Sequence, residues 1–225
     1  MKITYLGHAS LSIEVAGKKL IVDPFISPNE LAKNIDVDTL EADYILITHA
    51  HQDHIVDVDS IAKRTGAKIV SNFEIVTHYG NKGFDGHPMN HGGSWKFDFG
   101  RLTYTNAIHT SSFPDGSYGG QPGGFLLETE EGNVYIAGDT ALSYDMKLIP
   151  MQCKLDLAVL PIGDNFTMGC ESAAIAADFV GCGRVLGYHY DTFGYIVIDH
   201  DRARDTFKQA GKELILLPIG DSMDV

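Results

Sequence analysis

The chain has 225 residues, of which 44% are hydrophobic and 21% charged, so its length and composition are those of one ordinary globular domain. The formal net charge of -13 argues against a polyanionic partner, and we expect no binding to nucleic acid. No apolar run approaches the roughly 18 residues that span a bilayer, no leader precedes the first predicted strand, and three scattered cysteines indicate no disulfide framework. We therefore expect a cytoplasmic protein without a membrane partner.

The first part of the chain predicts a meander of strands followed by a crossover. Short β-type runs separated by glycines lie at residues 3–6, 11–15 and 19–22, and Asp23-Pro24 ends the third. After a polar connection, a strand, a helix and a strand are predicted in that order, which indicates a right-handed crossover with parallel pairing. These elements lie at residues 44–48, 55–65 and 68–70, followed by a short helix at 71–79 and a glycine-rich loop at 80–94.

The rest of the chain predicts two hairpins and then alternating strands and helices. The hairpin arms lie at residues 95–99 with 102–108 and at 125–128 with 133–137, and a long glycine-rich loop, 110–124, separates the two hairpins. Loops of this length inside a compact domain are usually functional. Helices are predicted at 143–152, 171–180 and 199–210, alternating with strands at 155–160, 184–188 and 213–217. The pattern predicts mixed strands with helices outside, in a single domain over 1–225.

Four side chains that commonly bind metals lie within six residues, directly after the strand at 44–48. They are His49, His51, Asp53 and His54. Neutral imidazole suits zinc, nickel, iron and manganese, and a carboxylate supplies negative charge. His49 and His51 are two residues apart, so in extended backbone both project to the same side and can bind one ion. Asp53 and His54 lead into the next helix, where they could hold a second ion.

Three further strands end in residues of the same kind. The run 102–108 leads to His109, 134–138 to Asp139 and 185–188 to His189. Strand ends in an α/β sheet converge on one edge, where ligands bind. The sequence therefore predicts one site of seven side chains contributed by distant segments.

The segment His49–His54 resembles the metallo-β-lactamase superfamily, whose signature is His-x-His-x-Asp-His. The resemblance implies an αββα sandwich, in which two mixed β-sheets lie face to face with helices on both outer sides. It also implies two metal ions, one bound by His49, His51 and His109 and the other by Asp53, His54 and His189, with Asp139 bridging them. True β-lactamases usually have Cys where this chain has Asp139, so the resemblance favours the phosphodiesterase, thioesterase and lactonase branches.

Shorter motifs resemble the small metal-dependent hydrolases related to L-ascorbate-6-phosphate lactonase, over nearly the whole chain. They are Gly7-His8-Ala9-Ser10, Asp23-Pro24-Phe25, Tyr118-Gly119-Gly120 and Asn165-Phe166-Thr167-Met168-Gly169. Folds of this superfamily consist of two similar halves. An internal repeat agrees with this, since the runs 157–164 and 214–221 both end in Pro-Ile-Gly-Asp.

Five residues are candidates for substrate contact or for support of the ligands: His8, Asp23, Gly119, Gly120 and Asn165. His8 either has such a role or simply packs. Asp23 either orients a ligand imidazole through its other ring nitrogen or caps a turn. The two glycines either present backbone N–H groups to an anion or form a tight connection, and Asn165 either lines the pocket or closes a turn. His87 and His91 remain unassigned.

We expect two divalent ions, zinc first, with manganese, nickel or iron as alternatives, holding a hydroxide between them. This hydroxide would hydrolyse a small-molecule lactone, thioester or phosphoester, with Asp53 as a ligand that also holds the proton of the water. A nuclease or phosphodiesterase of the same fold is an alternative, although the chain lacks the basic arm typical of nucleases. An iron-dependent redox enzyme, a non-catalytic metal-binding protein and a homo-oligomer also stay open.

Overall fold

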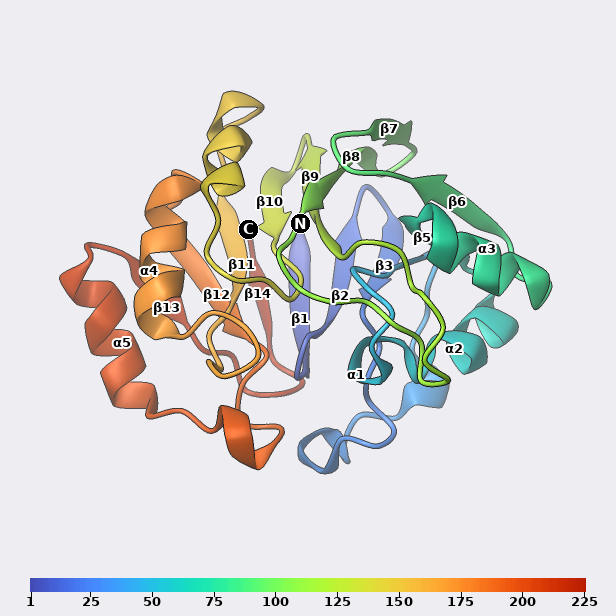
Figure 1. The fold of residues 1–225 in the computed structure, drawn as a ribbon, viewed down its shortest axis with the longest axis horizontal. Coiled ribbons are helices and arrows are strands. Elements are labelled where there is room, and N and C mark those ends of the chain that lie inside the picture. Colours follow the sequence, from blue (N-terminus) through green and yellow to red (C-terminus); the bar gives the residue numbers. More distant parts are fainter.

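The computed structural model describes all residues 1–225 and consists of two seven-stranded mixed β-sheets packed face to face. Helices α2 (Val58–Thr65) and α3 (Phe73–Asn81) lie on one flank, and α4 (Cys170–Phe179) and α5 (His200–Gln209) lie on the opposite flank (Figure 1). The αββα sandwich expected from the sequence is confirmed. None of the helices has the length and hydropathy needed to cross a membrane.

The first sheet has the order β14-β1-β2-β3-β4-β5-β6. The strands β14, β1, β2 and β3 pair antiparallel, and β3, β4, β5 and β6 pair parallel. Their bounds are β1 Lys2–Gly7, β2 Ser10–Val15, β3 Lys18–Val22, β4 Tyr44–Leu46, β5 Lys68–Asn72, β6 Gly86–Met89 and β14 Ser222–Asp224.

The second sheet has the order β13-β12-β11-β10-β9-β8-β7. It repeats the first sheet's pattern, because β7 to β10 pair antiparallel and β10 to β13 pair parallel. The bounds are β7 Ser94–Phe97, β8 Gly100–Asn106, β9 Gly123–Thr129, β10 Gly132–Ile136, β11 Leu157–Pro161, β12 Arg184–Tyr188 and β13 Glu213–Ile215. The final strand, β14, returns to the first sheet, so the two termini lie side by side there.

The repeated Pro-Ile-Gly-Asp does not relate the two halves. Its first copy begins with the last residue of β11 and its second follows β13, and both strands belong to the second sheet. The prediction that the repeat reflects the two halves is therefore wrong. What the halves share is the order and direction of their strands.

Strands in the middle of each sheet are apolar on both faces, because each face is covered. In β3, Leu20 and Val22 pack between the sheets while Ile21 packs beneath the helices of its flank. In β11, Val159 points between the sheets and Leu160 toward α4 and its neighbours. Side chains alternate across a strand, so a continuous apolar run fills two cores at once.

Several predicted boundaries differ from the structure. The helix expected at 55–65 is divided into α1 (Gln52–Ile55) and α2. Asp57 lies at the break, where its carboxylate accepts hydrogen bonds from the backbone N–H groups of Ile26 (2.6 Å) and Ser27 (3.0 Å). The chain turns there because the side chain of Asp57 holds the loop after β3. No local sequence pattern predicts this contact.

Four other elements were misjudged. The loop expected at 80–94 contains β6, a polar strand with Pro88 at a sheet edge, where a missing donor is tolerated. The helix expected at 143–152 is a 3-10 helix, η3 (Tyr144–Met151), with Pro150 inside it. The strand expected at 213–217 ends at Ile215, and β14 was not predicted. Short 3-10 turns complete the chain: η1 Glu30–Ala32, η2 Val37–Thr39 and η4 Gly194–Ile196.

Candidate metal centre

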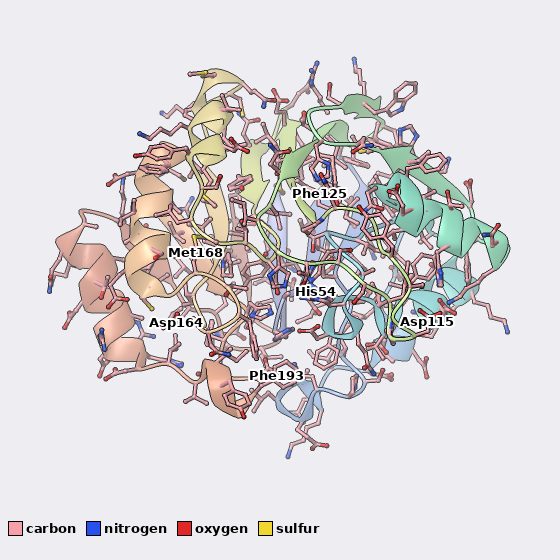
Figure 2. The ribbon with its side chains drawn as sticks, in the orientation of Figure 1. His54, Asp115, Phe125, Asp164, Met168 and Phe193 are labelled. Atoms are coloured by element: carbon pink, nitrogen blue, oxygen red, sulfur yellow. The ribbon has the colours of Figure 1, made fainter.

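The segments that carry the seven predicted ligands meet at one edge of the sandwich. The loop after β4 carries His49 and His51, and α1 carries Asp53 and His54. His189 directly follows β12, whereas His109 and Asp139 lie three residues beyond β8 and β10. All seven side chains fall into three overlapping groups whose ligand atoms lie within 4.8 Å of one another. Figure 2 shows His54 near the middle of the molecule, between the two flanks.

The first group consists of His49, His51 and His109. Nε2 of His49 lies 2.9 Å from Nδ1 of His51. Nδ1 of His49 lies 3.1 Å from the Thr48 hydroxyl, which itself donates to Asp23, so the ring donates from Nδ1 and leaves Nε2 free as an acceptor. Burial lowers the pKa of all three rings, so they are neutral imidazoles suited to bind a metal.

The second group consists of Asp53, His54 and His189, joined by His8. Oδ2 of Asp53 lies 3.0 Å from Nε2 of His8, 3.7 Å from Nε2 of His189 and 3.8 Å from Nε2 of His54. Burial opposes ionisation of Asp53, but these three rings hold its pKa well below the usual range. Asp53 is therefore a carboxylate surrounded by imidazoles.

Asp139 lies between the two groups. Its Oδ2 is 2.9 Å from Nε2 of His189, 3.4 Å from that of His54, 3.6 Å from that of His109 and 4.0 Å from that of His49. Four rings from both groups thus point at one carboxylate oxygen. This is the placement required of a ligand shared by two ions.

The protein groups alone do not satisfy this centre. Nε2 of His54, Oδ1 of Asp139 and both ring nitrogens of His189 are buried and make no well-aligned hydrogen bond, although Nε2 of His189 lies 2.9 Å from Oδ2 of Asp139. Burial favours neutral rings, yet the nearby carboxylates raise both pKa values. Asp139 and Asp53 raise the pKa of His189 to about 9, and together with Asp23 they raise that of His54 well above its usual value. No Lys or Arg forms an ion pair with Asp53 or Asp139. Buried carboxylates with unpartnered imidazoles fit divalent cations well.

Asp23 connects Thr48 to His54, which lie at the two ends of the segment that carries the first four predicted ligands (the ligand loop, residues 48–54). Its Oδ1 accepts from the backbone N–H of Thr48 (2.8 Å), and its Oδ2 accepts from the Thr48 hydroxyl (2.6 Å) and from Nδ1 of His54 (2.9 Å). The last bond leaves Nε2 of His54 facing the centre. Asp23 thus occupies the position of a residue that orients a ligand imidazole.

Gly119 and Gly120 lie behind the ligand loop in a tight connection. The backbone N–H of Gly119 donates to Ser111 O, and its carbonyl accepts from Asn72 Nδ2 (2.8 Å) and Ser111 Oγ (2.9 Å). A Cβ at Gly119 would overlap that of Ala50, and Gly120 has φ +75°. The N–H of Gly119 is therefore not available to an anion.

Asn165 is not brought to the centre. With Asp164 it lines a cavity of about 420 Å³ between the loop after β11 and α5, and none of the seven candidate ligands lines that cavity. His87 packs against Trp95 and Phe97, and Nε2 of His91 lies 2.9 Å from Pro122 O. Neither histidine approaches the predicted ligands.

Some residues that hold the centre together were missed. Asn72 and Ser111 fix Gly119, and Thr192 Oγ1 lies 2.9 Å from Nδ1 of His8. Asn72 could have been suspected, because it is polar and ends a buried strand. No sequence pattern pointed to Thr192, because it lies 184 positions from His8, its hydrogen-bond partner.

Comparison with known proteins agrees with this arrangement. Residues 2–189 match the family described as the beta-lactamase superfamily domain. A UPF0173 metal-dependent hydrolase of Flavobacterium johnsoniae is 64% identical over 225 residues, and one of Christiangramia forsetii is 63% identical over 226, each match covering 100% of both chains. The chain belongs to the UPF0173 metal-dependent hydrolases of the beta-lactamase superfamily.

Among solved structures, Igni18 of Ignicoccus hospitalis, a metallo hydrolase, is similar over 99% of this chain and 97% of its own, with 35% identity and a TM-score of 0.89. As a UPF0173 member, the protein is a metal-dependent hydrolase.

Proposed function

We propose that this UPF0173 hydrolase uses two divalent metal ions to hydrolyse a small-molecule lactone, thioester or phosphoester. The observation that carries the proposal is Oδ2 of Asp139, which lies within 4.0 Å of Nε2 of four histidines from both ligand groups. His49, His51 and His109 would hold one ion, Asp53, His54 and His189 the other, and Asp139 both. The donor set suits zinc first, and manganese, nickel or iron as well.

When bound, the ions supply a Lewis acid and a water activated at neutral pH. The residues of the chain position and assist this chemistry. The side chain of Asp53 is 26% exposed, whereas that of Asp139 is 3% exposed, so Asp53 is the carboxylate that solvent and substrate can reach. It is placed to hold the proton of the attacking water. His51 and His109 are also partly exposed.

The acidic surface also supports a small-molecule substrate. A net charge of -13 repels polynucleotides, which argues for a small ester over a nucleic acid. Iron-dependent redox chemistry is an alternative function for the same set of ligands. Oxygen consumption by the iron-loaded protein would reveal it.

The test is elemental analysis of the purified protein, followed by turnover of a panel of lactones, thioesters and phosphodiesters after reconstitution with each metal. We expect two ions per chain and turnover of at least one ester class. Asp53→Ala should lower kcat at least about 100-fold. Asp201→Ala, which changes a side chain 96% exposed on α5, is the matched control and should keep full activity. Full activity of Asp53→Ala, or no turnover with any metal, would contradict the proposal.

A further inference from the structure

His8 is buried at the centre but is not one of the seven predicted ligands. It follows β1 directly, is 1% exposed and has φ +53°, a left-handed conformation that is uncommon for residues other than Gly, although Asn, Asp and His adopt it more often than the rest. Its backbone carbonyl accepts hydrogen bonds from the Tyr5 hydroxyl (3.1 Å) and from the backbone N–H of His189 (2.8 Å). The strained backbone is therefore held from both sheets, which suggests that the position of this ring matters.

Both ring nitrogens of His8 have specific partners. Nδ1 lies 2.9 Å from Thr192 Oγ1, and Nε2 lies 3.0 Å from Oδ2 of Asp53. An ionised carboxylate can only accept, so the proton of the ring must be on Nε2, and the Thr192 hydroxyl donates to Nδ1. The other acceptor near that hydroxyl, Tyr190 O, is farther away at 3.3 Å.

The remaining surface of the ring is packed. Its centroid lies 4.1 Å from that of His189, 5.2 Å from that of Phe193 and 5.4 Å from that of Phe25. These contacts leave the ring little freedom to turn. The packing of the ring therefore holds Nε2 toward Oδ2 of Asp53.

We propose that His8 is a positioning residue that, oriented by Thr192, donates a hydrogen bond to Asp53 and so fixes this carboxylate for the second metal ion. The inference rests on the two-metal function proposed above. The cluster of His8, Asp53, His54 and His189 also admits His8 as a direct ligand. The two roles differ in what can replace the imidazole: a positioning donor can be replaced by an amide N–H, whereas a ligand nitrogen cannot.

Two variants separate these roles. His8→Asn tolerates the left-handed backbone, but its amide is too short to reach Asp53. His8→Gln has a longer side chain that can present an N–H where Nε2 now lies. Thr192→Val removes the orienting hydroxyl at nearly constant volume, so it tests the same chain of hydrogen bonds if neither His8 variant folds. His91→Gln, outside the centre, is the matched control.

The measurement is a competitive chelator titration with Co(II) and with Zn(II), which resolves the two binding steps, together with circular dichroism to verify folding. For His8→Asn we expect the second ion to bind about 10–100-fold more weakly and the first to change by less than about twofold. His8→Gln should recover most of the loss, Thr192→Val should weaken the second step several-fold, and His91→Gln should change neither step.

An equal loss of affinity for the second ion in His8→Gln and His8→Asn would overturn the proposal in favour of direct ligation. An unchanged second step in His8→Asn, or in Thr192→Val where the His8 variants do not fold, would also overturn it. If the wild-type protein binds fewer than two ions, the two-metal function itself fails, and this outcome is distinct from failure of the role of His8 alone.

Discussion

At the scale of single residues, Asp23 shows how one side chain can serve both the fold and the site. It is fully buried, accepts hydrogen bonds from three donors and has φ +43°. Burial raises its pKa even though His54 and Thr48 favour the charged form. Removing its negative charge should therefore affect both stability and metal affinity.

We predict that Asp23→Asn destabilises the metal-free protein by about 2–4 kcal/mol, because an amide cannot accept from all three donors, while Asn tolerates the left-handed backbone. Affinity for the ion held by His54 should fall about 10–100-fold. Urea denaturation and metal titration measure the two effects.

Asp57→Asn is the control for this prediction. Asp57 is another buried carboxylate that accepts backbone N–H groups, but it contacts no predicted ligand. This variant should lose stability and keep its metal affinity. Normal metal binding by Asp23→Asn would show that Asp23 does not orient His54.

At the scale of elements, the ligand loop after β4 depends on the connection between β8 and β9. Ser111 Oγ accepts from the backbone N–H of Ala50 (3.1 Å) and donates to the carbonyl of Gly119, so the side chain of Ser111 joins the two loops. The long loop that the sequence marks as functional thus supports the ligands from behind.

We predict that Gly119→Ala lowers stability by about 1–3 kcal/mol, since its methyl group would overlap Ala50 and lie 2.7 Å from Ser111 Oγ. In a chain of this size that corresponds to a fall in Tm of about 2–4 °C per kcal/mol. Gly194→Ala, where a methyl group meets nothing within 4 Å, should leave Tm unchanged in the same calorimetric experiment. Equal Tm values for the two variants would refute the packing argument.

The segment after His189 offers an apolar side chain beside the centre. Phe193 is 37% exposed, and its ring lies 5.2 Å from that of His8. We predict that Phe193→Ala raises KM for esters with aryl or alkyl groups about 10-fold with little change in kcat, because it removes apolar contact away from the reacting bond. Steady-state kinetics with aryl esters checks this. Tyr144→Ala, exposed on η3, is the control, and an unchanged KM in Phe193→Ala would contradict the prediction.

At the scale of the whole molecule, the proposed metal centre joins the two sheets. His49, His51, Asp53 and His54 come from the first half of the sandwich, and His109, Asp139 and His189 come from the second. Ions held by both halves bind only the folded chain and therefore stabilise it.

We predict that chelation lowers Tm by about 5–10 °C for each ion removed, because saturation at 100 times Kd contributes about 2.7 kcal/mol per site. Differential scanning calorimetry before and after chelation measures the shift, and added zinc should reverse it. In Asp139→Asn, which lacks the shared carboxylate, the shift should be much smaller. A Tm unaffected by chelation of metal-loaded wild-type protein would argue against ions that join the halves.

The sequence by itself determined the seven residues that converge and a pattern of mixed strands with helices outside, because strand-end ligands and doubly apolar strands are local patterns with few structural solutions. The αββα arrangement followed from the resemblance of the segment His49–His54 to the metallo-β-lactamase superfamily. Only the tertiary structure decided what supports them: the break at Asp57, the return of β14, the Ser111–Gly119 contact and the pairing of His8 with Thr192 and Asp53. These contacts join positions far apart in the chain, and their strength comes from burial and geometry, which no local pattern encodes.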